Sequence, residues 1–229
     1  PRVTKHRTGA VRFFAPPPGS WAIVSPAAAA LAPEDAAAAF LDQHAGAFEY
    51  CTDNTTLTVE RVTDGSPTRA VRFAQFYSGV PVLGSSIVVH LDDANRVSSV
   101  MSDLMSDSRA LDQAPDAVTP AFPASTAREY GAEWLAPRLD ERVRYYMAQL
   151  DALAAAGEID AAQYEASMRR AESESLGMGE ETRLVIVDQG LLGRSGVPRL
   201  TWEVTGRSEP AGRVKERLYI DAHSGEVIH

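Results

Sequence analysis

Cysteine is nearly absent from this chain: Cys51 is the only one among 229 residues. A lone cysteine excludes an internal disulfide and a metal site built from thiolates. A single thiol with no neighbour of its kind is predicted to be a buried, inert residue, and pairing between two molecules is the alternative. Covalent cross-links within the chain therefore cannot explain its stability.

Long hydrophobic runs are also missing. The most apolar stretch, Ala22–Ala39, is interrupted by Pro26, Pro33, Glu34 and Asp35, and a membrane helix needs about 18 consecutive apolar residues. The first residues carry positive charge but no apolar core behind it, so no signal peptide is recognised; either one was removed or none existed. The sequence predicts a soluble chain with no membrane partner.

Positive charge is in short supply. Lys and Arg number 22 against 31 Asp and Glu, which gives a formal net charge of −9. Nucleic acids and anionic membranes reward clustered positive charge, so neither is expected as a partner. A basic partner surface fits this charge, and so does an ordinary acidic protein. The 45% of hydrophobic residues predicts a packed globular core.

Catalytic signatures are missing as well. The five histidines, which are His6, His44, His90, His223 and His229, do not form the His-Glu-x-x-His arrangement of a zinc peptidase. There is no nucleophile elbow, phosphate-binding loop or Cys/His zinc cluster. The acidic pairs Asp92-Asp93 and Glu180-Glu181 fall at predicted turns, where solvated charge is expected. The chain is predicted not to be an enzyme, and an enzyme with an unrecognised site is a remaining hypothesis.

What is present predicts an α+β fold of two units, each with helices on an antiparallel sheet. Residues 1–32 are expected to be an extended segment with a short edge strand at Val11–Phe14. A unit over 33–107 begins with a helix at Pro33 and continues with strands. The predicted strands are Thr56–Val62, Arg69–Tyr77, Ile87–Leu91 and Arg96–Met101, with a tight turn at Asp64-Gly65 between the first two.

Residues 108–123 are proline-punctuated and are predicted to be a linker to a second unit over 124–229. In that unit Thr126 and Glu129 have capping-box spacing ahead of a helix that Pro137 ends or kinks. A helical hairpin is expected as an insertion over 139–175, its second helix capped by Asp160 and Gln163. The last predicted strands are Arg183–Asp188, Arg199–Thr205 and Val214–Ile220.

The most distinctive segment lies in the first unit and contains Gln75, Tyr77, Gly79, Val80, Pro81 and Val82. Gly79 can adopt a positive φ and Pro81 removes a hydrogen-bond donor, which indicates a hairpin with an irregular or bulged connection. The segment resembles the FTP motif in the pro-regions of secreted thermolysin-like and fungalysin-like zinc peptidases. The resemblance implies a part of a peptidase precursor that carries no catalytic residues of its own.

The end of the chain has a second resemblance. Trp202, Tyr219, Asp221, Gly225 and Glu226 fall in segments that look like the PepSY domain, which follows the FTP motif in such pro-regions. On the residues alone, Asp221 is expected to bond backbone amides of the turn and Gly225 to adopt a positive φ. Trp202 and Tyr219 are expected to pack in the core. The hairpin at 139–175 departs from this family pattern.

Together the resemblances imply an intramolecular chaperone and cleft-blocking inhibitor of a zinc metallopeptidase encoded downstream in the same precursor. The chain would be secreted or periplasmic and would need no cofactor, because zinc and calcium would belong to the partner. Val227, Ile228 and His229 are expected to lie product-like in the partner's cleft, with His229 near its zinc. The alternative is a stand-alone PepSY/FTP binding module that restrains or escorts an exported protein in trans.

Overall fold

The computed structural model describes residues 1–6, 9–17, 19–20, 30–50, 53–65, 68–114 and 116–228. Cys51 and His229 lie outside these ranges, so the predictions made for them stay predictions. The chain divides into two compact units. Unit 1 comprises residues 1–118 and 186–199, and unit 2 comprises residues 119–185 and 200–229. None of the described helices is both long enough and apolar enough to span a bilayer.

Unit 1 is built on an antiparallel sheet in which the strands follow the order β3-β4-β5-β6-β2-β1. These strands are β1 (Arg2–Lys5), β2 (Val11–Ala15), β3 (Thr55–Asp64), β4 (Arg69–Tyr77), β5 (Val80–Leu91) and β6 (Val97–Asp103). The strands predicted from alternation are confirmed. However, β2, which was predicted as an edge strand, lies between β1 and β6 and pairs with both. β1 was missed because its exposed side chains show no alternation; pairing with β2 defines it. The turn expected at Asp64-Gly65 is longer than predicted, since Asp64 pairs with Arg69.

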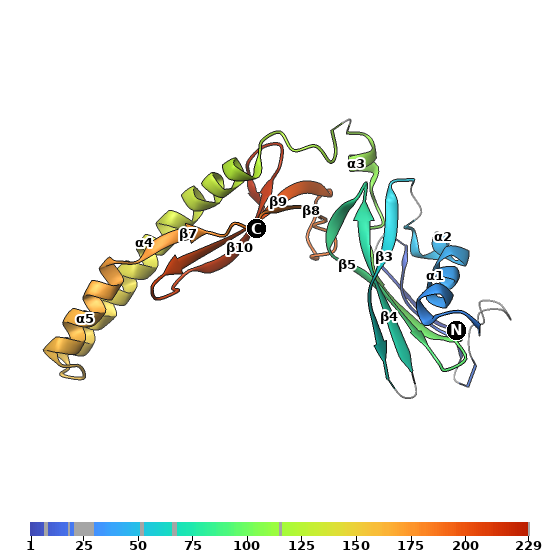
Figure 1. Cartoon of the computed structure of the whole chain (residues 1–229), viewed down its shortest axis with the longest axis horizontal. Helices are drawn as coiled ribbons and strands as arrows, with labels where there is room; N and C mark the ends of the chain where they lie inside the picture. Colours follow the sequence, from blue (N-terminus) through green and yellow to red (C-terminus); the bar gives the residue numbers. More distant parts are fainter. Residues whose placement is uncertain are drawn as a thin grey trace. The chain divides into compact units, whose positions relative to one another are not determined.

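Two helices cover one face of this sheet (Figure 1). Helix α1 (Pro33–Gln43) starts with the predicted proline in its first turn, and α2 (Ala45–Phe48) follows directly. Their buried side chains meet those of the strands in one apolar core. The largest core members from helices and strands are Phe40, Leu41, Phe48, Val71, Phe73, Ile87, Val89, Leu91 and Val97.

Unit 2 places one long helix against an antiparallel sheet in the order β7-β9-β10-β11. Its elements are α4 (Ala124–Ala155), α5 (Ala161–Glu172), β7 (Ser175–Met178), β9 (Arg199–Glu209), β10 (Lys215–Asp221) and β11 (Val227–Ile228). Strand β8 (Arg183–Val187) precedes β9. The core between α4 and the sheet contains Ala127, Leu135, Leu139, Val204, Val214, Leu218 and Ile220. The mixed helix-and-sheet class is thus confirmed.

The prediction for the start and course of α4 was wrong. Pro123, not Thr126, is the N-cap residue, and no side chain caps the helix. Pro137 lies inside a continuous helix of 32 residues, so the expected short first helix and the first arm of the hairpin are one element. Arg138 donates to the carbonyl of Trp134 at 2.9 Å and stacks on its ring. This side chain supplies a hydrogen bond next to the position where proline lacks a donor.

Helix α5 begins as predicted. The Asp160 side chain accepts from the Gln163 amide, and the Gln163 side chain returns a bond to the Asp160 amide. Both halves of the capping box are therefore present. Tyr164 also donates to Asp151 of α4 at 2.7 Å, which ties the two helices together near their connection. In Figure 1, α5 runs back along the C-terminal half of α4.

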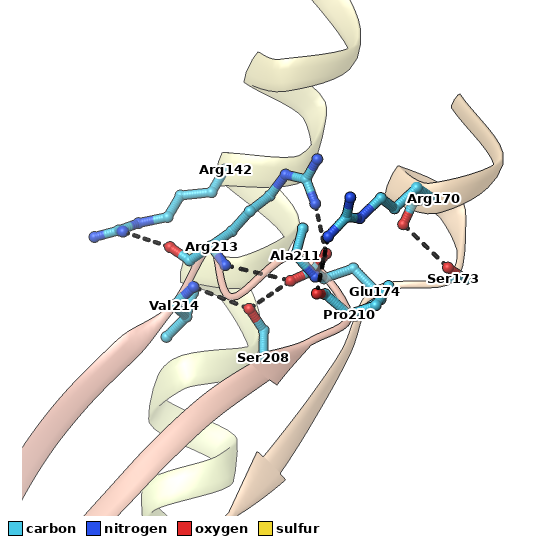
Figure 2. Close-up of polar contacts among 9 residues, drawn as sticks. All are labelled: Arg142, Arg170, Ser173, Glu174, Ser208, Pro210, Ala211, Arg213 and Val214. Atoms are coloured by element: carbon cyan, nitrogen blue, oxygen red, sulfur yellow. Dashed lines mark hydrogen bonds and ion pairs between the residues drawn. The ribbon is translucent and has the colours of Figure 1, made fainter. Parts of the chain in front are cut away.

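A buried carboxylate joins the end of α5 to the β9–β10 turn. Glu174, whose side chain is fully buried, accepts from Ser208 Oγ and from the amides of Ala211 and Arg213. The Arg213 guanidinium forms an ion pair with it. Figure 2 shows these donors converging on the Glu174 carboxylate from the turn. Because every donor comes from the strands or the turn, Glu174 fixes the hairpin tip against the helical part of unit 2.

Candidate functional site

The distinctive segment of unit 1 is a tight β-hairpin turn. Tyr77 pairs with Val80 across the turn, and the two residues between them both have positive φ, 46° at Ser78 and 82° at Gly79. Two central residues of this conformation match the twist of antiparallel strands. A Cβ added to Gly79 would meet no atom within 4 Å, so the glycine is required by backbone conformation and not by space.

The hairpin becomes irregular directly after the turn. Phe76 pairs with Pro81, but the next pair is Ala74 with Ser86. Gln75 on β4 therefore faces a bulged segment, residues 82–85, on β5. Within this bulge Val82 forms a parallel pair with Ile186 of β8. The bulged connection predicted from the sequence is confirmed, and the bulge frees β5 to contact the returning segment of unit 1.

Gln75 holds the chain that leaves the sheet. Its side chain is completely buried and donates to the Met105 carbonyl at 3.0 Å while accepting from the Met105 amide at 2.8 Å. Ser85, from the bulge, donates to the same Gln75 oxygen at 2.5 Å. The side-chain amide of Gln75 thus forms the two hydrogen bonds to Met105 that a neighbouring strand would form. It pairs the buried Met105 backbone groups and the Ser85 hydroxyl, which would otherwise be unpaired.

Tyr77 holds the same outgoing chain further along, at Asp112. Its buried hydroxyl donates to Asp112 at 2.8 Å, in the short helix α3 (Arg109–Asp112). Ser108 donates to the other Asp112 oxygen at 2.7 Å, and Asn54 donates to the first at 3.2 Å. Burial and the Asp112 hydrogen bond raise the pKa of Tyr77 to about 12. The bonds from Ser108 and Tyr77 lower the pKa of Asp112.

Gln75 and Tyr77 therefore act together as a clamp, here defined as Gln75, Tyr77, Ser85, Met105 and Asp112. All five lie in unit 1, and the two motif side chains sit on the buried face of β4 with Val71 and Phe73. Their polar groups are occupied by protein partners, so the clamp orders the chain and offers no open coordination or nucleophilic group. Across the described part of the chain, no cluster of three metal-ligating side chains occurs.

The partners Ser85, Met105 and Asp112 were missed by sequence reasoning. One signal was available: Gln75 interrupts an otherwise apolar buried face of β4, and a buried amide requires hydrogen-bond partners. The identity of those partners depends on contacts 10, 30 and 35 residues away along the chain. No local pattern encodes such contacts.

The turn near the end of unit 2 has the predicted form. Asp221 Oδ1 accepts from the amides of His223 and Ser224, both at 2.9 Å, and Gly225 has a φ of 78°. A Cβ on Gly225 would also approach the Tyr130 ring to 2.7 Å, so this glycine is required for both conformation and space. The exposed Glu226 contributes its carbonyl, which accepts from the Asp221 amide at 2.7 Å.

The two aromatic residues of this segment differ in role. Trp202 packs against the core of unit 2, and its indole donates to the Phe122 carbonyl at 3.2 Å. Tyr219 is half-buried and has the opposite orientation along the neighbouring strand, since Trp202 pairs with Ile220 and Tyr219 with Glu203. Both side chains are therefore partly buried: Trp202 packs against the core of unit 2 as expected, whereas Tyr219 lies on the opposite face of the sheet.

The expected inhibitory tail is partly engaged in the sheet. Val227 pairs with Ile220, and Ile228 pairs with Tyr219. Val227 also packs against the core of unit 2. Both residues are half-buried strand residues, and His229 lies outside the described residues. The structure therefore places Val227 and Ile228 in the sheet of unit 2, and the expected position of the tail in a partner's cleft stays a prediction.

One acidic residue differs from its prediction. Asp92 was expected to be a solvated turn charge, but it is only 7% exposed. It accepts from the amides of Ala94 and Arg96 and from the Arg96 guanidinium. Burial alone would raise the pKa of Asp92, but these hydrogen bonds outweigh burial and lower it. Asp92 therefore closes the β5–β6 turn, whereas Glu180 and Glu181 are exposed as expected.

Comparison with known proteins supports the first resemblance. Residues 56–104 match the model of the fungalysin/thermolysin propeptide motif, FTP, which covers β3 to β6 and the motif side of the clamp. No curated protein matches the chain. Among solved structures, the C-terminal domain of YpeB from Bacillus megaterium aligns with a TM-score of 0.31 and 15% identity. That alignment covers 86% of this chain and 63% of the other. The PepSY resemblance stays a prediction.

Proposed function

We propose that the chain is a pro-region of a secreted thermolysin-like or fungalysin-like zinc metallopeptidase, and that it binds the catalytic domain of its own precursor. The observation that carries this proposal is the FTP match over residues 56–104, which coincides with an ordered sheet and its buried clamp. In this proposal the chain supplies binding surface alone. Zinc and calcium belong to the partner peptidase.

The clamp gives this proposal a physical basis. A surface that is already ordered loses less conformational entropy on binding than a flexible one. Gln75 and Tyr77 hold the chain from Met105 to Asp112 against the sheet, so unit 1 presents a fixed shape. A pro-region that assists folding must offer such a shape to a catalytic domain that crosses its folding barrier slowly. A stable interface of this kind buries more than about 1,000 Å².

We further propose that the end of the chain blocks the cleft in the manner of a product. Val227 and Ile228 form an edge strand that pairs only with β10 among the described residues, and the other edge of a strand can pair with an extended binding site. In this arrangement β11 stays in its sheet while His229 reaches toward the zinc of the partner. The tail does not need to leave unit 2 to act.

Inhibition of the catalytic domain encoded in the same precursor tests this function. The full chain should inhibit that domain at a ratio of one to one. Deleting His229 alone should raise the inhibition constant by about tenfold or more, the equivalent of one lost strong contact, without lowering the stability of the chain. Replacing Glu158 with Gln is the matched control, because Glu158 is exposed in the connection between α4 and α5.

Three outcomes separate the claims. An unchanged inhibition constant after deletion of His229 would contradict the tail, but not the pro-region. A full chain that neither inhibits the catalytic domain nor improves its refolding would contradict the pro-region itself. Inhibition by a chain whose reading frame encodes no peptidase would instead support a binding module acting in trans.

A further inference from the structure

The loop between β8 and β9 exposes a continuous stretch of backbone. Residues 192–197 belong to unit 1, and all of them are exposed and lie outside any helix or strand. The side chains at the two ends of the stretch, Leu192 and Val197, are 52% and 51% exposed. Gly193 and Gly196 add no side chain that would shield the backbone. Exposed loops of this composition are where proteolytic nicking concentrates.

Hydrogen bonding divides this loop into a fixed part and an open part. In the fixed part, the amides of Leu192 and Arg194 both donate to the Gln189 carbonyl, at 3.1 and 2.9 Å. This bonding stops after Arg194. Residues 195–197 form no hydrogen bond with any residue that the structure describes. The chain after Arg194 can therefore extend along the groove of a protease without first losing bonds of its own.

Arg194 gives the open part a protease specificity. Among the described residues, it is the one exposed arginine or lysine that lies outside helices and strands. Two other arginines lie in described loops, but both are half-buried and paired, Arg96 with Asp92 and Arg213 with Glu174. A protease of the trypsin type selects a basic side chain through a carboxylate in its specificity pocket.

We infer that the peptide bond between Arg194 and Ser195 is a cleavage site for a trypsin-like endopeptidase. Residues 192–197 supply three exposed positions on each side of this bond. Cleavage is a hydrolysis that consumes one water molecule and breaks the C–N bond. The Arg194 carbonyl carbon gains the hydroxyl group and becomes a carboxylic acid. The Ser195 nitrogen gains the hydrogen and becomes an amine.

One cut at this bond divides unit 2 between two chains. Residues 1–194 keep α4 and β7, whereas residues 195–229 contain β9, β10 and β11. The apolar core of unit 2 is then shared between α4 on one chain and β9 and β10 on the other. Their association becomes bimolecular, so it weakens on dilution. Cleavage therefore makes the stability of unit 2 depend on the concentration of the protein.

Limited digestion of the full chain with trypsin tests the site. The first cut within residues 33–229, identified from the masses of the fragments, should fall between Arg194 and Ser195. Cuts before residue 33 are not counted, because they leave unit 2 whole. Arg194→Gln should slow the first counted cut by about tenfold or more. Every other arginine or lysine in this range lies in a helix or strand or is half-buried, and such sites must open locally before they are cut.

Arg144→Gln is the matched control, because Arg144 is also exposed but lies within α4. This substitution should change neither the rate nor the position of the first counted cut. The urea midpoint of each variant shows whether it is folded. A first cut at another residue of the counted range would overturn the inference, and so would equal rates for Arg194→Gln and the original chain.

Urea unfolding followed by tryptophan fluorescence tests the consequence of the cut. The midpoint of the chain cut at Arg194 should fall when the protein is diluted, whereas the midpoint of the intact chain should stay constant. A midpoint of the cut chain that does not depend on concentration would contradict the division of unit 2 between two chains.

The effect of the cut on a peptidase rests on the proposed function. Because β11 lies on the fragment 195–229, the cut chain should inhibit the catalytic domain less as it is diluted. If trypsin cuts first after Arg194 and the intact chain does not bind the catalytic domain, the cleavage site holds and the pro-region assignment fails. If the intact chain inhibits the domain and Arg194→Gln is cut as fast as the original chain, the pro-region assignment holds and the cleavage site fails.

Discussion

At the residue scale, the most important feature is the buried face of β4, which contains Gln75 and Tyr77 of the clamp. Val71, Phe73, Gln75 and Tyr77 alternate along it, and the alternation predicted a strand with one buried face. The pattern also contained an inconsistency, since an amide at a core position is unfavourable unless it is paired. The sequence could therefore indicate that Gln75 is special, but the partner Met105 lies 30 residues away and was unpredictable from local pattern.

Replacing Gln75 with Leu should lower the free energy of unfolding by roughly 3 kcal/mol, because the buried Met105 amide and the Ser85 hydroxyl lose their shared acceptor. Urea denaturation followed by circular dichroism measures the change. Gln43→Leu, at the exposed end of α1, should stay within about 0.5 kcal/mol of the original chain. Equal stability of the two variants would show that the Gln75 bonds contribute nothing to folding.

Replacing Tyr77 with Phe should reduce the loss of stability that the chain undergoes at alkaline pH. The Tyr77 pKa rises from 10.0 to about 12 in the folded chain. Its contribution is therefore fully present below pH 10.0 and is lost as the pH rises toward about 12. The urea midpoint measured between neutral and alkaline pH should fall less steeply in Tyr77→Phe than in the original chain. Parallel curves would contradict the burial of this hydroxyl.

At the element scale, the sequence predicted the helices and strands that short-range sequence patterns determine. Alternation placed β3 to β6, and the Asp160–Gln163 box placed the start of α5. The prediction that Pro137 ends or kinks its helix was wrong on the first count because packing of Leu135 and Leu139 against the sheet continues across it. Tertiary contacts thus override a local penalty of about 3 kcal/mol. The exposed β1 had no signal at all.

The bonds of Glu174 to the β9–β10 turn predict how the stability of the chain changes at acidic pH. Burial opposes ionisation of Glu174, but its bonds from Ser208, Arg213 and Ala211 outweigh burial and lower its pKa. Its contribution is therefore present above the ordinary pKa of glutamate and is lost as the pH falls through the lowered value. Glu174→Gln should cost about 3 kcal/mol at neutral pH, because Arg213 is left buried without its counter-ion.

Stability curves at neutral and acidic pH measure this effect. Glu172→Gln, two residues earlier and exposed, is the matched control and should change stability by less than about 0.5 kcal/mol. The difference between the Glu174→Gln variant and the original chain should shrink as the pH falls. A difference that is constant from neutral to acidic pH would show that the Glu174 charge is not what stabilises the hairpin tip.

The crossing of α4 over β9 gives a steric prediction. A Cβ at Gly206 would overlap Leu135 Cδ1, and Leu135 is fully buried and cannot move aside. Gly206→Ala should therefore destabilise unit 2 by about 1–3 kcal/mol, as overpacking does. Gly177→Ala on the paired strand β7, where a Cβ would make an ordinary 3.7 Å contact, is the control. Thermal unfolding compares the two, and equal midpoints would contradict the close packing at this crossing.

At the scale of the whole molecule, the sequence predicted a mixed helix-and-sheet fold, and the structure confirms it. The residues that make up each unit could not be predicted from the sequence. Residues 186–199 group with unit 1 although they lie between β7 and the rest of β9, which belong to unit 2. This return depends on the pair of Val82 with Ile186 and on the bulge that frees Val82. No composition change along the chain marks such a crossing.

A cleft in unit 1, lined by residues of segments 104–113 and 188–198, was also not predicted, because neither segment has a recognisable motif. The match to a peptidase propeptide motif over residues 56–104 supports the proposal that the chain is a pro-region, and the buried clamp orders unit 1. The central claim of that proposal is that the chain binds a zinc peptidase domain.

Equilibrium binding between the full chain and the catalytic domain of its precursor, measured by titration calorimetry, tests this claim most directly. The account predicts a one-to-one complex with a dissociation constant of about 1 μM or tighter, as an interface above about 1,000 Å² supports. Titration of a folded chain into an active catalytic domain without any binding would contradict it.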